Sequence, residues 1–253
     1  MSACHQLWDD GPDNPALADG EVHVWRACLR QQESALHELW LSLSADERER
    51  AGRFHFRKDR EHFVAARGVL RNLLGRYTGV APPLIRFSYN RYGKPALDGD
   101  ADDLLRFNAS HSNGLALYAV GRGREVGIDL EFVREDFAGL EIAERFFSPR
   151  EVSALRALPE GERSAAFFDC WVRKEAYVKA RGEGLSHPLR MFTVSLTPGE
   201  PAALLYTEVD LREAARWSLV GLSPCEGYRA ALAVEGEVLS LSCWRWLDVG
   251  ERA

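Results

Sequence analysis

Two stretches of this chain resemble each other: Arg60–Gly68 reads REHFVAARG, and Lys174–Gly182 reads KEAYVKARG. Five of the nine positions are identical, and two more exchange Arg for Lys or Phe for Tyr. Upstream of each stretch an S-x-x-E sequence begins, at Ser44 and at Ser148. This spacing predicts a helix start, because Ser and Glu three residues apart satisfy the free backbone N–H groups of a first turn. We therefore expect an internal duplication.

Strand patterns surround these helices in a similar order. Alternating apolar residues at Glu21–Leu29 and Glu125–Val133 predict a strand before each helical segment. Further strands are expected after the helices, at Ile85–Tyr89 and Phe192–Leu196. The order of elements in the first half is thus repeated in the second.

A hairpin is then expected to close each half. In the first, Leu115–Val120 would turn into the strand at Glu125; in the second, Arg229–Val234 would turn into Val238–Trp244. We predict an α+β fold with two similar halves, residues 1–122 and 123–253, related by a pseudo-two-fold axis. Each half would have mostly antiparallel strands with helices on one face. The cleft between the halves is the expected place for a small-molecule site.

The composition of the 253 residues excludes several classes of protein. Hydrophobic residues make up 46% and charged residues 28%, which is ordinary for a globular chain. The formal charge of −6 argues against nucleic-acid binding. No apolar run is long enough for a membrane helix and the N-terminus lacks signal-peptide features, so we expect a cytoplasmic protein that does not bind membranes. The five cysteines are scattered without a C-x-x-C pair, which predicts neither disulfides nor a zinc site.

Lysine is rare in this chain. Among 32 basic residues only four are lysines, namely Lys58, Lys94, Lys174 and Lys179. An ammonium is more compact than a guanidinium and can release a proton more easily, so a lysine in an arginine-rich chain indicates a position with a specific requirement. Chance is the alternative explanation.

Asp129 and Glu131 lie two residues apart on a predicted strand, so both carboxylates project from one face. Glu175, on a predicted helix, would add a third carboxylate if that helix crosses the end of the strand. Carboxylates together with phosphate oxygens are the usual ligands of Mg²⁺. Lys179, one turn after Glu175, would form an ion pair or reach a phosphate. Solvent-exposed surface charge is the alternative for each of these residues.

The polar segment Asn108–Ser112 follows an apolar stretch. A catalytic triad is not indicated, because Ser110 and His111 are neighbours in sequence, whereas a nucleophile and its base must face each other in space. Two roles remain for this segment: hydrogen bonding to a ligand, or formation of a turn. The basic segment Arg48–Arg67 would cradle a phosphorylated ligand or form a solvated helix face. No Walker or G-x-G-x-x-G sequence is present.

Four motifs in this order resemble the Sfp-type 4′-phosphopantetheinyl transferases: YGKP at Tyr92–Pro95, FNASHS at Phe107–Ser112, VGIDLE at Val126–Glu131 and WVRKEAYVKARGEGL at Trp171–Leu185. The resemblance extends from about Ser44 to Leu196. It implies a monomeric pseudo-dimer that moves the phosphopantetheine arm of coenzyme A to a serine of an acyl or peptidyl carrier protein and releases 3′,5′-ADP. The expected metal is Mg²⁺, with Mn²⁺ as an alternative.

The same resemblance implies roles for individual residues. Asp129, Glu131 and Glu175 would hold the metal, and Lys179 would neutralise or protonate the leaving phosphate. Either Glu175 or a water on the metal would accept the proton of the carrier serine. The residues implied to bind the coenzyme are Arg48, Lys58, Arg67, Lys94, Pro95, Ser110, His111, Lys174 and Lys179.

Two other functions are compatible with the motifs. One is a non-catalytic module that binds coenzyme A or a carrier protein, although such a module does not need a metal-binding and acid set. The other is a Mg²⁺-dependent phosphohydrolase with an unrelated phosphate substrate. The three functions differ in whether the arm is transferred to protein, is transferred to water, or is not transferred.

Overall fold

The computed structural model describes residues 8–98, 104–134, 139–184, 187–208, 210 and 212–247. In chain order its strands, α-helices and 3₁₀ helices (η) are β1 (Asp9–Asp10), β2 (Glu21–Cys28), α1 (Glu33–Leu41), α2 (Ala45–Gly52), α3 (Arg57–Thr78), η1 (Pro82–Leu84), β3 (Phe87–Tyr89), β4 (Pro95–Leu97), β5 (Leu105–Ser112), β6 (Leu115–Arg122), β7 (Val126–Phe132), α4 (Gly139–Phe146), α5 (Pro149–Ala157), α6 (Glu160–Arg181), η3 (Leu189–Met191), β8 (Phe192–Val194), β9 (Leu204–Thr207), η4 (Glu213–Arg216), β10 (Trp217–Leu222), β11 (Tyr228–Glu235) and β12 (Ser240–Arg245). The predicted α+β class is confirmed.

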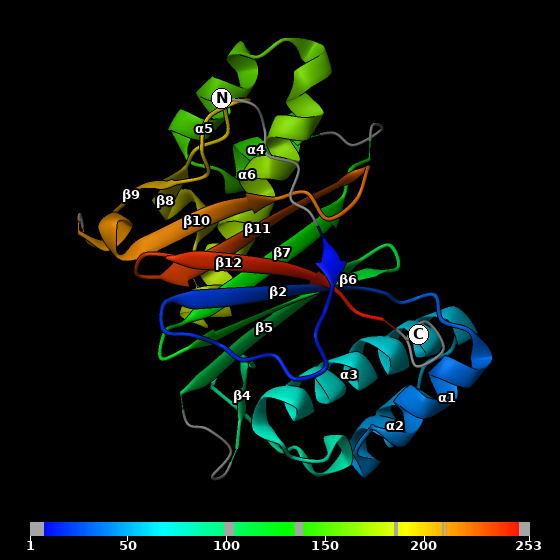
Figure 1. Cartoon of the computed structure of the whole chain (residues 1–253). Coiled ribbons are helices and arrows are strands. Elements are labelled where there is room, and N and C mark those ends of the chain that lie inside the picture. The colour runs from blue at the N-terminus through cyan, green and yellow to red at the C-terminus, as the bar shows by residue number, and fades with distance from the viewer. Residues whose placement is uncertain are drawn as a thin grey trace.

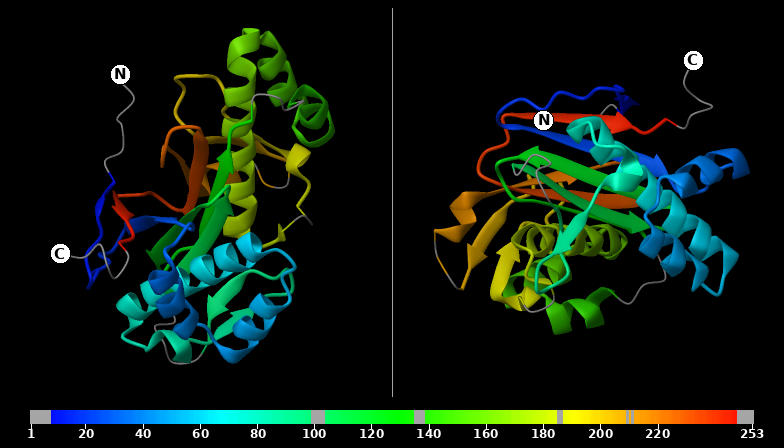
Figure 2. Two further views of the ribbon diagram at one scale, coloured as in Figure 1. Left: turned by 90° about the vertical axis from the view of Figure 1, so that its right-hand side faces the viewer. Right: turned by 90° about the horizontal axis from the view of Figure 1, so that it is seen from below.

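Two main sheets form the centre of the molecule. The first has the strand order β1-β12-β2-β6-β5, and the second has the order β10-β11-β7. An apolar core lies between the sheets; it is built from alternate residues of their strands, including Val22, Val24, Leu117, Ala119, Val126, Ile128, Leu130 and Leu232. Helices α1–α3 and α4–α6 gather in two separate groups, coloured blue to cyan and green to yellow (Figures 1 and 2). Each group packs on its own sheet.

Strand alternation explains why both faces of each sheet are buried. On β2, Val24 faces the second sheet while its neighbour Trp25 packs against the α1–α3 core. On β7, Ile128 and Leu130 enter the core between the sheets, so Asp129 and Glu131 project from the opposite face. The expectation that these two carboxylates share a face is confirmed.

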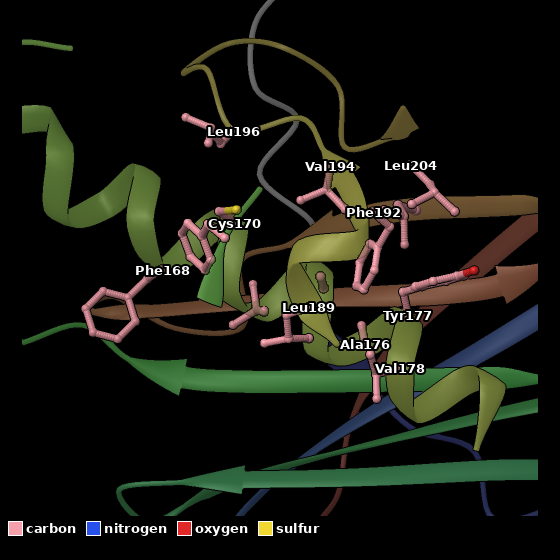
Figure 3. Close-up of a cluster of buried hydrophobic side chains, with 14 of the residues drawn as sticks. Phe168, Cys170, Ala176, Tyr177, Val178, Leu189, Phe192, Val194, Leu196 and Leu204 are labelled. Atoms are coloured by element: carbon pink, nitrogen blue, oxygen red, sulfur yellow. The ribbon is translucent and has the colours of Figure 1, made fainter. Parts of the chain in front are cut away.

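The core of the second half lies around α6. Aromatic and aliphatic side chains from α6, η3 and β8 pack together there, among them Tyr177, Leu189 and Phe192 (Figure 3). The Tyr177 and Phe192 rings meet edge to face, with centroids 4.9 Å apart. This packing fixes the helix that carries Glu175 and Lys179.

Both expected closing hairpins are wrong. β6 pairs with β2 and β5 rather than β7, and β11 pairs with β10 and β7 rather than β12. A strand has only two edges for hydrogen bonding, and in β6 and β11 both are already occupied. The chain therefore changes sheets after each of them, and β12 pairs in parallel with β2 of the first sheet. A division of the chain at residue 122 would cut through that sheet, and this boundary stays a prediction.

The duplication exists, but the nine-residue match does not define it. REHFVAARG lies in the first half of α3, whereas KEAYVKARG ends α6. Both helices have 22 residues, and each ends at a left-handed glycine, Gly79 or Gly182. Capping boxes at Ser44 and Ser148 start the preceding helices. The halves therefore correspond through their caps, and the nine-residue match is out of register.

This correspondence includes a buried ion pair in each half. The capping-box residue Glu47 contacts Arg71 of α3, and the capping-box residue Glu151 contacts Lys174 of α6 at 2.8 Å. Each cation also donates to two backbone carbonyls beyond its own helix. Arg71 reaches Pro82 and Ile85, while Lys174 reaches Leu189 at 2.8 Å and Phe192 at 2.6 Å. Each pair thus joins two helices to the chain that follows.

The sequence has no apolar run long enough for a membrane helix, and the helices of the structure can be checked for the same property. None of the helices in the described parts of the chain is long and apolar enough to cross a bilayer.

The buried pair in the second half leads to a stability prediction. Glu151→Gln leaves the fully buried ammonium of Lys174 without its compensating charge, which is expected to lower the free energy of unfolding by about 3–5 kcal/mol. Urea denaturation followed by tryptophan fluorescence measures this change. The matched control is Glu144→Gln, which breaks the exposed pair with Arg156 and should cost less than about 1 kcal/mol. Equal costs for the two variants would contradict the structural role of the buried pair.

Candidate functional site

The site forms where β5 and β7, the edge strands of the two sheets, run beside each other. Alternate polar side chains of β5 reach across to β7 through four hydrogen bonds, namely Ile128 N to Asn108 Oδ1 (2.9 Å), Ser110 Oγ to Asp129 Oδ1 (2.9 Å), Ser112 Oγ to Glu131 Oε2 (3.0 Å) and Phe132 N to Ser112 Oγ (3.2 Å). Because residues at i, i+2 and i+4 of a strand share a face, one row of side chains connects the two sheets. The hydrogen bonds from this row fix the positions of the Asp129 and Glu131 carboxylates.

Helix α6 approaches β7 unusually closely at Gly127. A Cβ atom at this residue would lie 2.1 Å from the carbonyl oxygen of Ala176 and 2.3 Å from the backbone nitrogen of Ala180, so only glycine fits. The close approach brings Lys179 to the carboxylates of the strand. Its Nζ donates to Asp129 Oδ1 at 2.5 Å and to Ser110 Oγ at 2.9 Å.

The site holds more negative than positive charge. Burial and the neighbouring Asp129 raise the pKa of Glu175, with Lys179 opposing. Burial and Asp129 also raise the pKa of Glu131, although the hydrogen bond from Ser112 lowers it. Two cations, the Lys179 ammonium and the Arg134 guanidinium, therefore act on three carboxylates, and a further cation would be stabilised among them.

Asp129 also has an oxygen suited to a metal. Its Oδ2 atom is buried and has no hydrogen-bond partner among the described residues. An unsatisfied carboxylate oxygen away from water is costly, and a cation would remove that cost. In the part of the chain that the structure describes, no three His, Cys, Asp or Glu side chains are already gathered as metal ligands. The donors fit a hard cation, but their convergence as expected from the motifs is not preformed.

Ser110 and His111 lie on opposite sides of β5, as neighbouring strand residues must. Ser110 is buried in the carboxylate group, whereas His111 is exposed. Partial burial and the charge of Lys179 lower the pKa of His111. His111 lies near His62 of α3, whose pKa is lowered by burial and by Lys58. Lys58 itself is exposed, so this group combines one ammonium with two imidazoles whose lowered pKa values favour the neutral form.

Lys94, in the turn between β3 and β4, lies against the C-terminal end of α6. Its ammonium contacts Glu125 at 2.5 Å and the carbonyl oxygen of Ala180 at 2.6 Å. Burial lowers its pKa, and the contact with Glu125 opposes that effect. Pro95, the next residue, begins β4. The structure therefore places Lys94 against the end of α6, and the coenzyme contact implied for these two residues stays a prediction.

Three other basic residues have structural partners. Lys174 is fully buried in its pair with Glu151, and a coenzyme cannot reach it without opening the core, so the binding role expected for it is wrong in this structure. Arg48 donates to the carbonyl oxygens of Trp40 and Leu41, which close the end of α1. Arg67 contacts the carboxylate of Glu47.

Three positions that build the site lie within the quoted motifs, but no individual role was predicted for them. Asn108 and Ser112 belong to the same row as Ser110, and Gly127 sets the distance between α6 and β7. Asn108 and Ser112 each lie two residues from Ser110, and this spacing indicates that all three side chains share one face of a strand. The role of Gly127 was not readable from sequence, because it depends on a helix about 50 residues away along the chain.

The close approach at Gly127 can be tested by stability. Gly127→Ala forces α6 away from β7, and overpacking of this kind is expected to lower the free energy of unfolding by about 1–3 kcal/mol. Gly221→Ala on β10 is the matched control. No atom of the described chain lies within 4 Å of the added methyl group there, so stability should stay within about 0.5 kcal/mol. Urea denaturation measures the free energy of unfolding of both variants. A Gly127→Ala variant as stable as the wild type would refute the tight contact.

The chain is similar to known proteins over most of its length. Residues 24–121 match the family model for the 4′-phosphopantetheinyl transferase N-terminal domain, and residues 125–233 match the model for the 4′-phosphopantetheinyl transferase superfamily. The 4′-phosphopantetheinyl transferase HetI of Nostoc is 45% identical over 90% of this chain and 94% of its own length. The 4′-phosphopantetheinyl transferase Sfp of Bacillus subtilis is 35% identical, over 66% of this chain and 72% of its own.

Among solved structures, the Chronobacterium ammoniagenes ACPS-CoA complex is similar at 23% sequence identity and a TM-score of 0.33, over 45% of this chain and 97% of that chain. The sequence matches to the two family models together cover more than half of this chain and leave out few residues between its halves. The chain belongs to the 4′-phosphopantetheinyl transferase family.

Proposed function

We propose that this chain transfers the 4′-phosphopantetheine arm of coenzyme A to a serine of an acyl or peptidyl carrier protein in a Mg²⁺-dependent reaction. The observation that carries this proposal is the group of Asp129, Glu131 and Glu175 around the ammonium of Lys179. Membership of the transferase family supports the reaction type. In the reaction the serine oxygen forms a bond to the β-phosphorus, the bond from that phosphorus to the bridging oxygen breaks, and 3′,5′-ADP leaves.

Asp129, Glu131 and Glu175 would hold the metal. The orphaned Oδ2 of Asp129 supports this assignment, as do the raised pKa values of the two glutamates, which result from burial and from the neighbouring Asp129. When bound, a divalent cation supplies positive charge that polarises the pyrophosphate of the substrate. The row from Asn108 to Ser112 keeps Asp129 and Glu131 oriented toward it.

Lys179 would stabilise the charge that develops on the leaving phosphate. Its ammonium is held by Asp129 and Ser110, so its position is fixed before substrate arrives. Preorganised charge costs no reorganisation in the transition state. Phosphoryl transfer depends mainly on such positioning and charge stabilisation.

Glu175 is the proposed acceptor of the serine proton. A carboxylate within reach of the serine hydroxyl can take up its proton as a general base. Glu175 lies on the face of α6 that meets Asp129. The proton would therefore pass from the serine hydroxyl to a carboxylate already inside the site.

The coenzyme phosphates would bind at the group of Lys58, His62 and His111, where Lys58 supplies positive charge and the imidazoles supply N–H donors. These side chains lie close enough together for Lys58 and His111 to lower the pKa of His62. Such a group in a chain with a net charge of −6 indicates a local anion site. The two halves already supply both sides of the site within one chain, which supports a monomer.

The proposed base gives a direct prediction. Glu175→Gln removes one negative charge without a change in size, so transfer should fall at least about 100-fold while the circular dichroism spectrum stays that of the wild type. Transfer is measured as the initial rate of carrier modification with saturating coenzyme A. Glu144→Gln, which alters an exposed carboxylate of α4, is the control and should keep its rate. Turnover of Glu175→Gln near that of the control would remove Glu175 from the mechanism.

The proposed reaction itself is tested by intact mass spectrometry. An apo carrier protein incubated with the wild-type chain, coenzyme A and Mg²⁺ should gain the mass of one phosphopantetheine group. The gain should disappear with EDTA and with Asp129→Ala, because the buried carboxylate is a proposed metal ligand.

Two other outcomes would identify the alternative functions. Coenzyme A binding without any carrier modification would favour a binding module. Release of free phosphopantetheine would favour a phosphohydrolase. Acyl and peptidyl carriers are assayed in parallel, so that a narrow carrier preference is not mistaken for inactivity.

A further inference from the structure

The turn between β3 and β4 lies against the C-terminal end of α6. Asn90 Nδ2 donates to the carbonyl oxygen of Gly182 at 2.7 Å, and Lys94 Nζ donates to that of Ala180 at 2.6 Å. The last carbonyls of a helix have no partner within the helix, so outside donors are needed there. Here both donors come from the other half of the duplication.

The donors of the Lys94 ammonium are fully used in this arrangement. Besides Ala180, they reach Glu125 Oε2 at 2.5 Å and, with a longer contact of 3.3 Å, the carbonyl oxygen of Val126. An ammonium has only three N–H donors, and none is left for a coenzyme phosphate. The side chain is also mostly buried, with 15% exposed.

The turn that carries these donors is braced internally. Asn90 Oδ1 accepts hydrogen bonds from the backbone nitrogens of Tyr92 and Lys94, both at 2.9 Å. Gly93 has a φ of 87°, a conformation that only glycine adopts without strain. At Gly182 a Cβ would lie 2.9 Å from Lys94 Cδ and 3.0 Å from Asn90 Nδ2, so the two surfaces fit closely.

We propose that Asn90 and Lys94 are positioning residues that clamp the end of α6 and thereby hold Lys179 at Asp129. Lys179 immediately precedes Ala180, whose carbonyl Lys94 binds, and its own Nζ lies 2.5 Å from Asp129 Oδ1. The Lys94 ammonium also interacts favourably with the negative, C-terminal end of the α6 dipole. This inference rests on the proposed transferase reaction, and it replaces the coenzyme contact expected for the Lys94 side chain.

Steady-state kinetics distinguish the two roles of Lys94. In Lys94→Met and Asn90→Ala, kcat should fall about tenfold or more with the KM for coenzyme A changed less than about twofold, because a displaced Lys179 harms the transition state rather than binding. Lys94→Arg, which still offers a cation to Ala180, should recover part of kcat. Arg91→Met is the matched control, since Arg91 is exposed on the same turn and stacks on Tyr92, and its kcat should stay that of the wild type.

A second measurement tests the clamp without enzyme activity. Hydrogen exchange of the backbone amides at the end of α6, including Gly182 N, which donates to Val178, should speed up in Lys94→Met and Asn90→Ala but not in Arg91→Met. A raised KM with unchanged kcat would overturn the proposal in favour of direct coenzyme binding. Unchanged exchange and kcat in both variants would also overturn it. If the wild type modified no carrier, the proposed reaction would fail, whereas the exchange result would still decide whether the clamp exists.

Discussion

The carboxylate of Glu151 holds together three parts of the second half, and the active-site helix depends on it. It accepts hydrogen bonds from Ser148 N at the start of α5 and from Val194 N in β8, and it pairs with the buried ammonium of Lys174. A buried charge of this kind tolerates little displacement, because loss of one partner leaves the other unpaired and away from water. Since Lys174 immediately precedes Glu175, the pair fixes the turn of α6 that faces the carboxylates. The equivalent pair of Glu47 and Arg71 shows that the first half uses the same device.

The functional site lies at the seam of the two sheets rather than inside either half. β5 supplies the hydroxyl groups, β7 supplies Asp129 and Glu131, and α6 supplies Glu175 and Lys179. Each element is held from outside the site: β5 and β7 by their sheets, α6 by Gly127 on one side and by the turn Asn90–Lys94 at its end. The site can therefore retain an excess of negative charge, because the favourable free energy of the surrounding packing offsets the repulsion between the carboxylates.

Some of the site was predictable and some was not, for reasons visible at single residues. The shared face of Asp129 and Glu131 follows from strand alternation, which is local, and it is confirmed. The helix starts at Ser44 and Ser148 are also local and correct. Lys174 was different: its neighbours Arg173 and Glu175 gave no sign that it lies in the core, since its partners Glu151, Leu189 and Phe192 are brought to it only by folding. The rarity of lysine did indicate specific ammonium positions, since Lys94, Lys174 and Lys179 each form an ion pair in this fold.

The sequence by itself determined the fold class, the order of the elements, the existence of a duplication and the residue types of the candidate site. These follow from periodicity, capping residues and motif order, which act over a few neighbouring residues. Only the tertiary structure decided which strands pair, which register relates the halves and what each cation contacts. β12 joins β2 because β11 has no free edge, and Lys94 reaches Ala180 because two segments 86 residues apart in sequence are packed side by side. Such choices depend on competition for hydrogen-bonding edges and buried space across the whole chain, and no local pattern records that competition.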